Sequence, residues 1–239
     1  MRYLMILTYN GKNFNGFQKQ KNTDNTIQSI VENAIKIITK EEVNLTPSGR
    51  TDAGVSAYFQ PVHFEVDKPL NEQQFIKSMN GILPNEIRVL NIKESKIHAR
   101  FDAKQKTYIY KMYISEIENP LINNALKLHP NTNVKLMKKF AKLLIGTHDF
   151  LGFRASGGIN ETTVRTIYSA KLEKNENFLT FKITGNGFLY KMVRNIVGTM
   201  IKIGEGKLDI NTIKSTLFTT FKSTNTAKPE YLYLYNVKY

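Results

Sequence analysis

The sequence predicts an α+β fold of two ferredoxin-like, RRM-like units with antiparallel sheets, joined side by side with a cleft between them. Two observations indicate this. Strand-like and helix-like stretches follow one another in the first half, and the second half repeats this order with variations. The 239 residues suffice for one large or two small domains, and no low-complexity linker separates the halves.

The N-terminal stretch predicts a strand, a turn and a helix. Residues 2–9 are rich in Leu, Met, Ile and Tyr, which is typical of a buried strand, and Asn10-Gly11 ends it with turn chemistry. Over residues 25–39, apolar side chains recur at the spacing of one helix face. A short strand is then expected at residues 43–46.

The rest of the first half continues the pattern. Residues 62–66 alternate apolar with polar side chains and predict a strand. Asn71 and Gln74 form a capping box for a helix that ends near Gly81, and residues 87–92 predict the next strand. The order is therefore strand, helix, strand, strand, helix, strand, which is a split βαβ arrangement.

The second half varies the same theme. We expect an N-terminal domain over residues 1–100 and a C-terminal domain over residues 101–239, with the join among the polar residues 96–106. The elements predicted for the second domain are strands at 108–114, 163–172, 178–184 and 231–239 and helices at 134–145, 190–203 and 209–217.

Composition limits the possible functions. Lys and Arg number 34 against 20 Asp and Glu, a net charge of +14 that favours a polyanionic partner such as nucleic acid, although a lysine-rich proteome gives the same excess. The chain has no cysteine, so disulfides, thiol nucleophiles and thiolate zinc sites are excluded. Without an apolar run of the roughly 20 residues that a membrane helix needs, a soluble cytoplasmic protein is expected.

A loop follows the strand expected at 43–46 and carries unusual chemistry. Gly49 and Gly54 lie on either side of Asp52, which predicts a shaped loop. Arg50 and Asp52 are two residues apart, so in an extended segment both side chains point to the same side. A polar turn with an ordinary arginine–aspartate pair is the alternative interpretation.

The string GRTDAGV at residues 49–55 resembles the signature of the TruA family of tRNA pseudouridine synthases, whose aspartate is the nucleophile. Further segments resemble that family in the same order, from residue 16 to residue 234. They are GFQKQ at 16–20 (phenylalanine where tryptophan is usual), HARF at 98–101 with KTY at 106–108, FR at 153–154, NGF at 186–188, MVRNIVG at 192–198 and PEYLYL at 229–234.

The reaction that this resemblance implies is the conversion of uridine to pseudouridine. A glycosidic bond is broken and rebuilt to carbon 5 of the same base, which one carboxylate nucleophile can do without a cofactor or metal. Asp52 is the candidate nucleophile, because it alone among the acids is flanked by glycines and arginine in this way. Whether it attacks the sugar or the base carbon stays open.

The resemblance also implies roles for other residues. Tyr108 would stack on the target uracil, since a flipped-out base needs an aromatic or apolar floor. Arg194 would pair with Asp52 and favour its ionised form. Arg50, which is planar, charged and able to stack, would fill the gap that the flipped uridine leaves.

Three further residues are expected at the site, and two positions depart from the family. Asn186 and Phe188 are expected to line the pocket and Leu232 to form an apolar wall. Ser56 stands where histidine commonly follows the signature, and Tyr231 stands where glycine is usual.

These two departures leave the RNA target open. The expected substrate is the anticodon stem-loop of tRNA at positions 38–40. Ribosomal RNA is one alternative, and a non-catalytic RNA-binding protein is another, although the aromatic RNP string expected of the latter is missing from the sequence. The resemblance further implies a homodimer.

Overall fold

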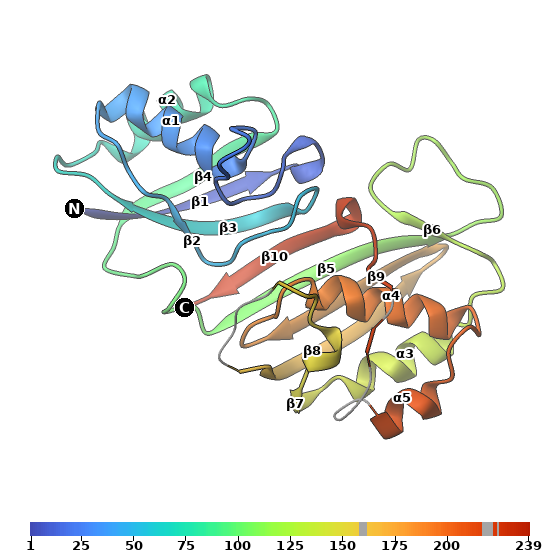
Figure 1. Cartoon of the computed structure of the whole chain (residues 1–239). Coiled ribbons are helices and arrows are strands. Elements are labelled where there is room, and N and C mark those ends of the chain that lie inside the picture. Colours follow the sequence, from blue (N-terminus) through green and yellow to red (C-terminus); the bar gives the residue numbers. More distant parts are fainter. Residues whose placement is uncertain (158–161, 217–221, 224) are drawn as a thin grey trace. The chain divides into compact units, whose positions relative to one another are not determined.

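The computed structural model describes residues 1–157, 162–216, 222–223 and 225–239 (Figure 1). Contacts divide the chain into two compact units, Met1–Lys104 with Tyr233–Tyr239, and Gln105–Leu232. Each unit combines helices with a sheet, so the predicted α+β class is confirmed.

The first unit has the predicted strand and helix order. Its sheet runs β4-β1-β3, with β2 antiparallel on one end of β3 and β10 parallel at the other, where Tyr233 pairs with Ser56. Figure 1 shows α1 and α2 together over this sheet. The elements are β1 (Arg2–Tyr9), α1 (Ile27–Thr39), β2 (Thr46–Pro47), β3 (Ser56–Glu65), α2 (Glu72–Ile82), β4 (Ile87–Glu94) and β10 (Leu232–Lys238), with a 3₁₀ turn at Gly11–Asn13.

Alternating burial and side-chain caps account for these elements. Every second residue of β1, from Tyr3 to Tyr9, is buried, as the period of a strand requires. Thr26 caps α1 by accepting from the Ser29 N–H, and Asn71 caps α2 by accepting from the Gln74 N–H at 3.0 Å. The predicted helix start at Asn71 is therefore confirmed.

The strand expected at residues 43–46 is wrong in extent. The chain pairs with β3 only at Thr46–Pro47, because the Leu45 peptide is bonded to α1 instead. The Leu45 N–H donates to Glu32 Oε1 at 2.9 Å, and its carbonyl accepts from the Gln28 amide at 3.2 Å. The next strand begins at Ser56 rather than at residue 62.

The second unit is built around a strand order of β5-β9-β8-β7, with the short β6 parallel to β5. Helix α3 packs on α4. The elements are β5 (Gln105–Ile114), β6 (Leu126–Leu128), α3 (Val134–Leu143), β7 (Gly146–Asp149), β8 (Val164–Asn175), β9 (Phe178–Gly185), α4 (Met192–Gly204) and α5 (Ile210–Thr216), with 3₁₀ turns at Leu151–Phe153 and Pro229–Tyr231. Residue 217, the expected end of α5, lies outside the described residues.

Helix α4 is more deeply buried than its sequence predicts. Asn195, a polar residue of this helix, is only 5% exposed. Its amide donates to the Phe153 carbonyl at 2.8 Å and accepts from Thr226 Oγ1 at 2.6 Å. A buried amide needs such partners, so Asn195 ties the helix to its neighbours rather than to solvent.

A buried histidine connects the sheet of the first unit to the segment that follows β4. His63 is 6% exposed, and its Nδ1 accepts from the Ala99 N–H at 3.1 Å, which requires the neutral ring. Burial, together with the neighbouring His98 and Arg2, lowers the pKa of His63 to about 4. The folded chain therefore stays unprotonated here at a pH where the unfolded chain takes up a proton.

This difference predicts acid sensitivity. His63 contributes its full stability above about pH 6.5, and the contribution is lost as the pH falls toward 4. Between pH 6.5 and pH 5, the free energy of unfolding should fall by about 1 to 2 kcal/mol from this group. Urea unfolding at both pH values measures this loss.

The matched variants are His63→Gln, whose amide oxygen can still accept, and His129→Gln at an exposed ring. His63→Gln should flatten the pH dependence and His129→Gln should not. An equally steep loss in His63→Gln would contradict the assignment.

Candidate active site

The loop that carries Asp52 lies against the loop that follows β1. The Phe17 N–H donates to the Thr51 carbonyl at 3.1 Å, and the Gly54 N–H donates to the Phe14 carbonyl at 3.3 Å. Gly54 has a φ of +80°, so the shaped loop predicted around Asp52 does use a glycine-favouring conformation. In this setting Asp52 is half-buried and Arg50 is exposed.

Gly16 lies close to the backbone of the Asp52 loop. Its φ is +96°, and a Cβ at this position would lie 3.1 Å from the Thr51 carbonyl oxygen and 3.3 Å from the Asp52 carbonyl carbon. The next residue, Phe17, is fully buried. The beginning of the GFQKQ segment therefore supports the Asp52 loop.

A buried polar network holds the same loop from the side of the sheet. Tyr9 Oη and Thr51 Oγ1 share a hydrogen bond of 2.8 Å. The Gln60 amide donates to the Gly49 carbonyl at 2.7 Å and to Tyr9 Oη at 3.4 Å, and it accepts from Ser48 Oγ at 2.7 Å. The network thus anchors both residues that flank Arg50.

Sequence reasoning missed these supporting residues. Burial raises the pKa of Tyr9, so its hydroxyl stays protonated within the network. Gln60 is fully buried in β3, and its sequence neighbours Phe59 and Pro61 give no sign of that role. A buried glutamine requires partners, and here the partners are the loop residues.

Ser56, which replaces the usual histidine, faces inward. It is 5% exposed, and its Oγ accepts from the Gly11 N–H at 2.9 Å. This position therefore fastens the loop after β1 to the start of β3.

In the second unit, two of the expected residues are in contact. Tyr108 in β5 is 9% exposed. Its ring and the Phe188 ring meet edge to face, with ring centroids 5.2 Å apart and an angle of 86° between the ring planes. Asn186 holds the chain just before Phe188. Its Oδ1 accepts from the Thr166 N–H at 2.9 Å, and its own N–H donates to the Thr166 carbonyl at 3.0 Å. Asn186 therefore positions the turn through backbone contacts.

Arg194 and Leu232 belong to a second group in this unit. Arg194 is half-buried, its Nε donates to the Ala227 carbonyl at 2.8 Å, and the Ala227 N–H donates back to the Arg194 carbonyl at 3.1 Å. Tyr110 Oη donates to the Lys228 carbonyl at 3.0 Å. The chain that leads to Leu232, which is 5% exposed, is thereby attached to α4 and β5.

The expected site residues fall into two sets. Asp52 and Arg50 lie in the first unit, whereas Tyr108, Asn186, Phe188, Arg194 and Leu232 lie in the second. Within each unit, backbone contacts fix the candidate residues or the segments that carry them. That the two sets form one site stays a prediction.

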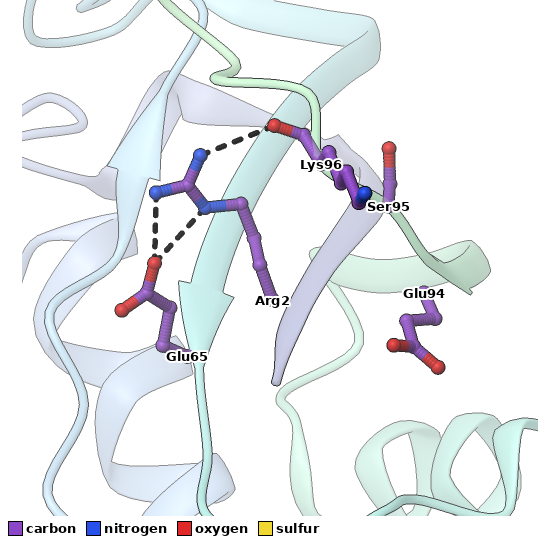
Figure 2. A pocket seen from close by; sticks show the side chains of 5 residues that line it. All are labelled: Arg2, Glu65, Glu94, Ser95 and Lys96. Carbon is purple, nitrogen blue, oxygen red and sulfur yellow. Dashed lines mark hydrogen bonds and ion pairs between the residues drawn. The ribbon is translucent and has the colours of Figure 1, made fainter.

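A surface hollow of about 550 Å³ in the first unit contains none of these residues (Figure 2). Its lining consists of Arg2, Glu65, Glu94, Ser95 and Lys96. The Arg2 guanidinium donates twice to Glu65 Oε1, at 2.8 and 3.0 Å, and once to the Lys96 carbonyl. Its charge is already paired, which gives no reason to assign a ligand here.

The described residues show neither a metal cluster nor a membrane-spanning helix. No cluster of three or more His, Asp or Glu side chains in the described part of the chain is arranged to hold a metal ion. No helix among the described residues combines the length and apolar character needed to cross a membrane.

Comparison with known proteins shows relatives along the whole chain. The tRNA pseudouridine synthase A of Thermoanaerobacter sp. (strain X514) is 40% identical over 245 residues, covering 100% of both chains. A tRNA pseudouridine synthase A 2 of Bacillus cereus is 37% identical over 242 residues, covering 99% of both.

One solved structure, the archaeal box H/ACA sRNP Nop10–Cbf5 complex, is similar at 14% identity with a TM-score of 0.37, over 84% of this chain and 44% of that one. A likeness this remote carries no weight here. A family model described as tRNA pseudouridine synthase matches residues 5–102 and 140–239, which include Asp52 and Arg194. Together with relatives that align from end to end, this match shows that the chain belongs to the tRNA pseudouridine synthase family.

Proposed function

We propose that this protein isomerises uridine to pseudouridine in tRNA, at positions 38–40 of the anticodon stem-loop, as a cytoplasmic enzyme without a cofactor. The observation that carries the proposal is the Asp52 loop, whose peptides are fixed on one side by Gly16 and Phe17 and on the other by Tyr9 and Gln60. Membership of the family supports the reaction class.

In this proposal Asp52 is the nucleophile. Its carboxylate forms a covalent bond to the sugar or to the base, the N1–C1′ bond breaks, and the detached uracil turns so that C5 bonds to C1′. A carboxylate bound to C1′ leaves as C5 bonds there, whereas one bound to the base leaves afterwards; the proton on C5 is then lost and N1 gains a proton. Product and substrate are isomers, so the reaction needs no redox partner.

The other candidate residues would hold the substrate. Tyr108, supported edge-on by Phe188, is the floor for the uracil, and Leu232 is an apolar wall. Asn186 fixes the edge of that pocket through its contacts with Thr166. These groups offer a flipped-out base the planar and apolar surfaces that it loses on leaving its stack.

Two arginines would act around the nucleophile. Arg194 would pair with Asp52 and keep it ionised, and its Nε bond to Ala227 limits where the guanidinium can turn. Arg50 is exposed and two residues from Asp52, which suits a side chain that takes the place of the extruded uridine.

The site therefore combines the proposed domain of residues 1–100, which carries Asp52, with the domain of residues 101–239. A homodimer that binds one tRNA across both copies completes the proposal. Size-exclusion chromatography with light scattering measures that assembly directly.

The test of this function is tritium release from tRNA labelled with [5-³H]uridine, followed by mapping of pseudouridines in total RNA with and without the protein. New pseudouridines at tRNA positions 38–40 are expected. Sites in ribosomal RNA alone would overturn the tRNA assignment, and binding without tritium release would indicate a non-catalytic RNA-binding protein.

Replacing the nucleophile is the first prediction for this site. Asp52→Asn keeps the shape of the side chain but removes its charge, so tritium release should fall by more than about a thousandfold. Affinity for tRNA, measured by filter binding, should stay close to that of the wild type. An Asp52→Asn enzyme that releases tritium at the normal rate would exclude the mechanism.

A second prediction concerns the network under the loop. Tyr9→Phe leaves the buried Thr51 hydroxyl and Gln60 amide one partner short, which should cost about 1 to 3 kcal/mol of stability. A displaced Asp52 loop should also lower kcat about ten- to hundredfold, with little change in the KM for tRNA.

Tyr3→Phe is the matched control, because Tyr3 is a buried tyrosine of the same strand whose hydroxyl accepts from the Leu70 N–H at 2.9 Å. It should lose comparable stability and keep kcat. Equal kcat values for the two variants at a temperature where both are folded would refute the positioning role of Tyr9.

A further inference from the structure

The HARF segment exposes an aromatic ring that the proposed reaction does not use. Phe101 is 74% exposed, more than any other large apolar or aromatic side chain of the first unit for which the structure describes exposure. The His98 ring stacks on it at 4.3 Å between centroids and an angle of 28°. The Arg100 guanidinium carbon lies 5.5 Å from the centre of the ring. Ring and guanidinium form one exposed stack.

The turn that presents this stack is rigidly held. His98 Nδ1 accepts from the N–H groups of Arg100 and Phe101 at 3.3 and 3.2 Å, and the His98 N–H donates to Asp102 Oδ2 at 2.8 Å. Below the turn, Ala99 is fully buried, and its carbonyl accepts from Tyr239 Oη at 2.9 Å. An exposed aromatic ring on such a fixed base is already arranged for a partner.

The charge of the segment that carries the ring favours RNA over an apolar protein surface. Lys96, Arg100 and Lys104 lie within nine residues, and the one acid among them, Asp102, bonds the His98 N–H. Basic groups interleaved with an exposed aromatic ring suit a nucleotide, whose base stacks while its phosphate meets the cations. An apolar partner would have to bury these charges without compensation.

We propose that Phe101 and Arg100 form an RNA contact, on which an unpaired base of the tRNA substrate stacks while a neighbouring phosphate binds Lys96 or Lys104. The proposal rests on the proposed function, since it takes the ligand to be tRNA, and it adds a contact point that none of the seven candidate site residues supplies.

The chain has no tryptophan, so a single one introduced at this site reports on stacking directly. F101W should lose most of its tryptophan fluorescence as tRNA is added. The tRNA concentration at half of this loss should equal the midpoint that filter binding gives for the same variant. F178W is the matched control, because Phe178 is another exposed phenylalanine, 46% exposed, at the start of β9. Its emission should stay unchanged at saturation.

Affinity gives a second readout. Loss of one base stack predicts that F101A binds tRNA about five- to hundredfold more weakly, whereas F178A should stay within about twofold of the wild type. R100A should also weaken binding to tRNA. The slope of the logarithm of the binding constant against the logarithm of the salt concentration should become less steep by about one unit. F101W retains a ring and stays informative if F101A fails to fold.

The outcomes separate this proposal from the function on which it rests. Wild-type protein that binds tRNA and releases tritium, together with an F101W emission that tRNA leaves unchanged and normal affinity in F101A, would overturn the stacking contact alone. Wild-type protein that neither binds tRNA nor releases tritium would overturn both.

Discussion

The hydrogen bonds of Tyr9 and Gln60 to the Asp52 loop are the constraint on which the candidate site depends. A carboxylate that attacks carbon must be held in place, yet a loop between two strands has few contacts of its own. Here Gln60 binds the Gly49 carbonyl and Tyr9 binds the Thr51 hydroxyl, so the residues on both sides of Arg50 are tied to the sheet. Because these groups are buried, each is costly to leave without a partner.

The two units use the same type of strand in different ways. The first long strand of each has a neighbour on both sides: β1 lies between β3 and β4, and β5 lies between β9 and the short β6. In β1, Tyr9 at the end of the strand supports the Asp52 loop through its hydrogen bond to Thr51. In β5, Tyr108 contacts Phe188 and is proposed to receive the base. One architecture thus supplies a scaffold in the first unit and a proposed binding surface in the second.

The sequence predicted the elements with long periodic patterns, namely β1, α1, α2, β4, α3 and α4. It failed where the pattern was short or where a side chain competed with the sheet. β6 and β7 have three and four residues, too few for a period, and Glu32 and Gln28 take the Leu45 peptide out of the predicted strand. The burial of Asn195 could not be predicted, because an amide looks polar in sequence while its partners come from distant segments. The Tyr9–Gln60 network was invisible for the same reason.

The contact at Gly16 couples two parts of the chain that are far apart in sequence. The segment after β1 and the loop after β2 meet backbone to backbone, with no side chain between them to absorb a displacement. The loop therefore lacks its final shape until residues 14–17 have docked, and transient local opening of either segment releases the other. Amide hydrogens at Phe17 and Gly54 are then expected to exchange as one cooperative unit, and the lifetime of the proposed nucleophile's fixed position would be the time for which that small unit stays closed.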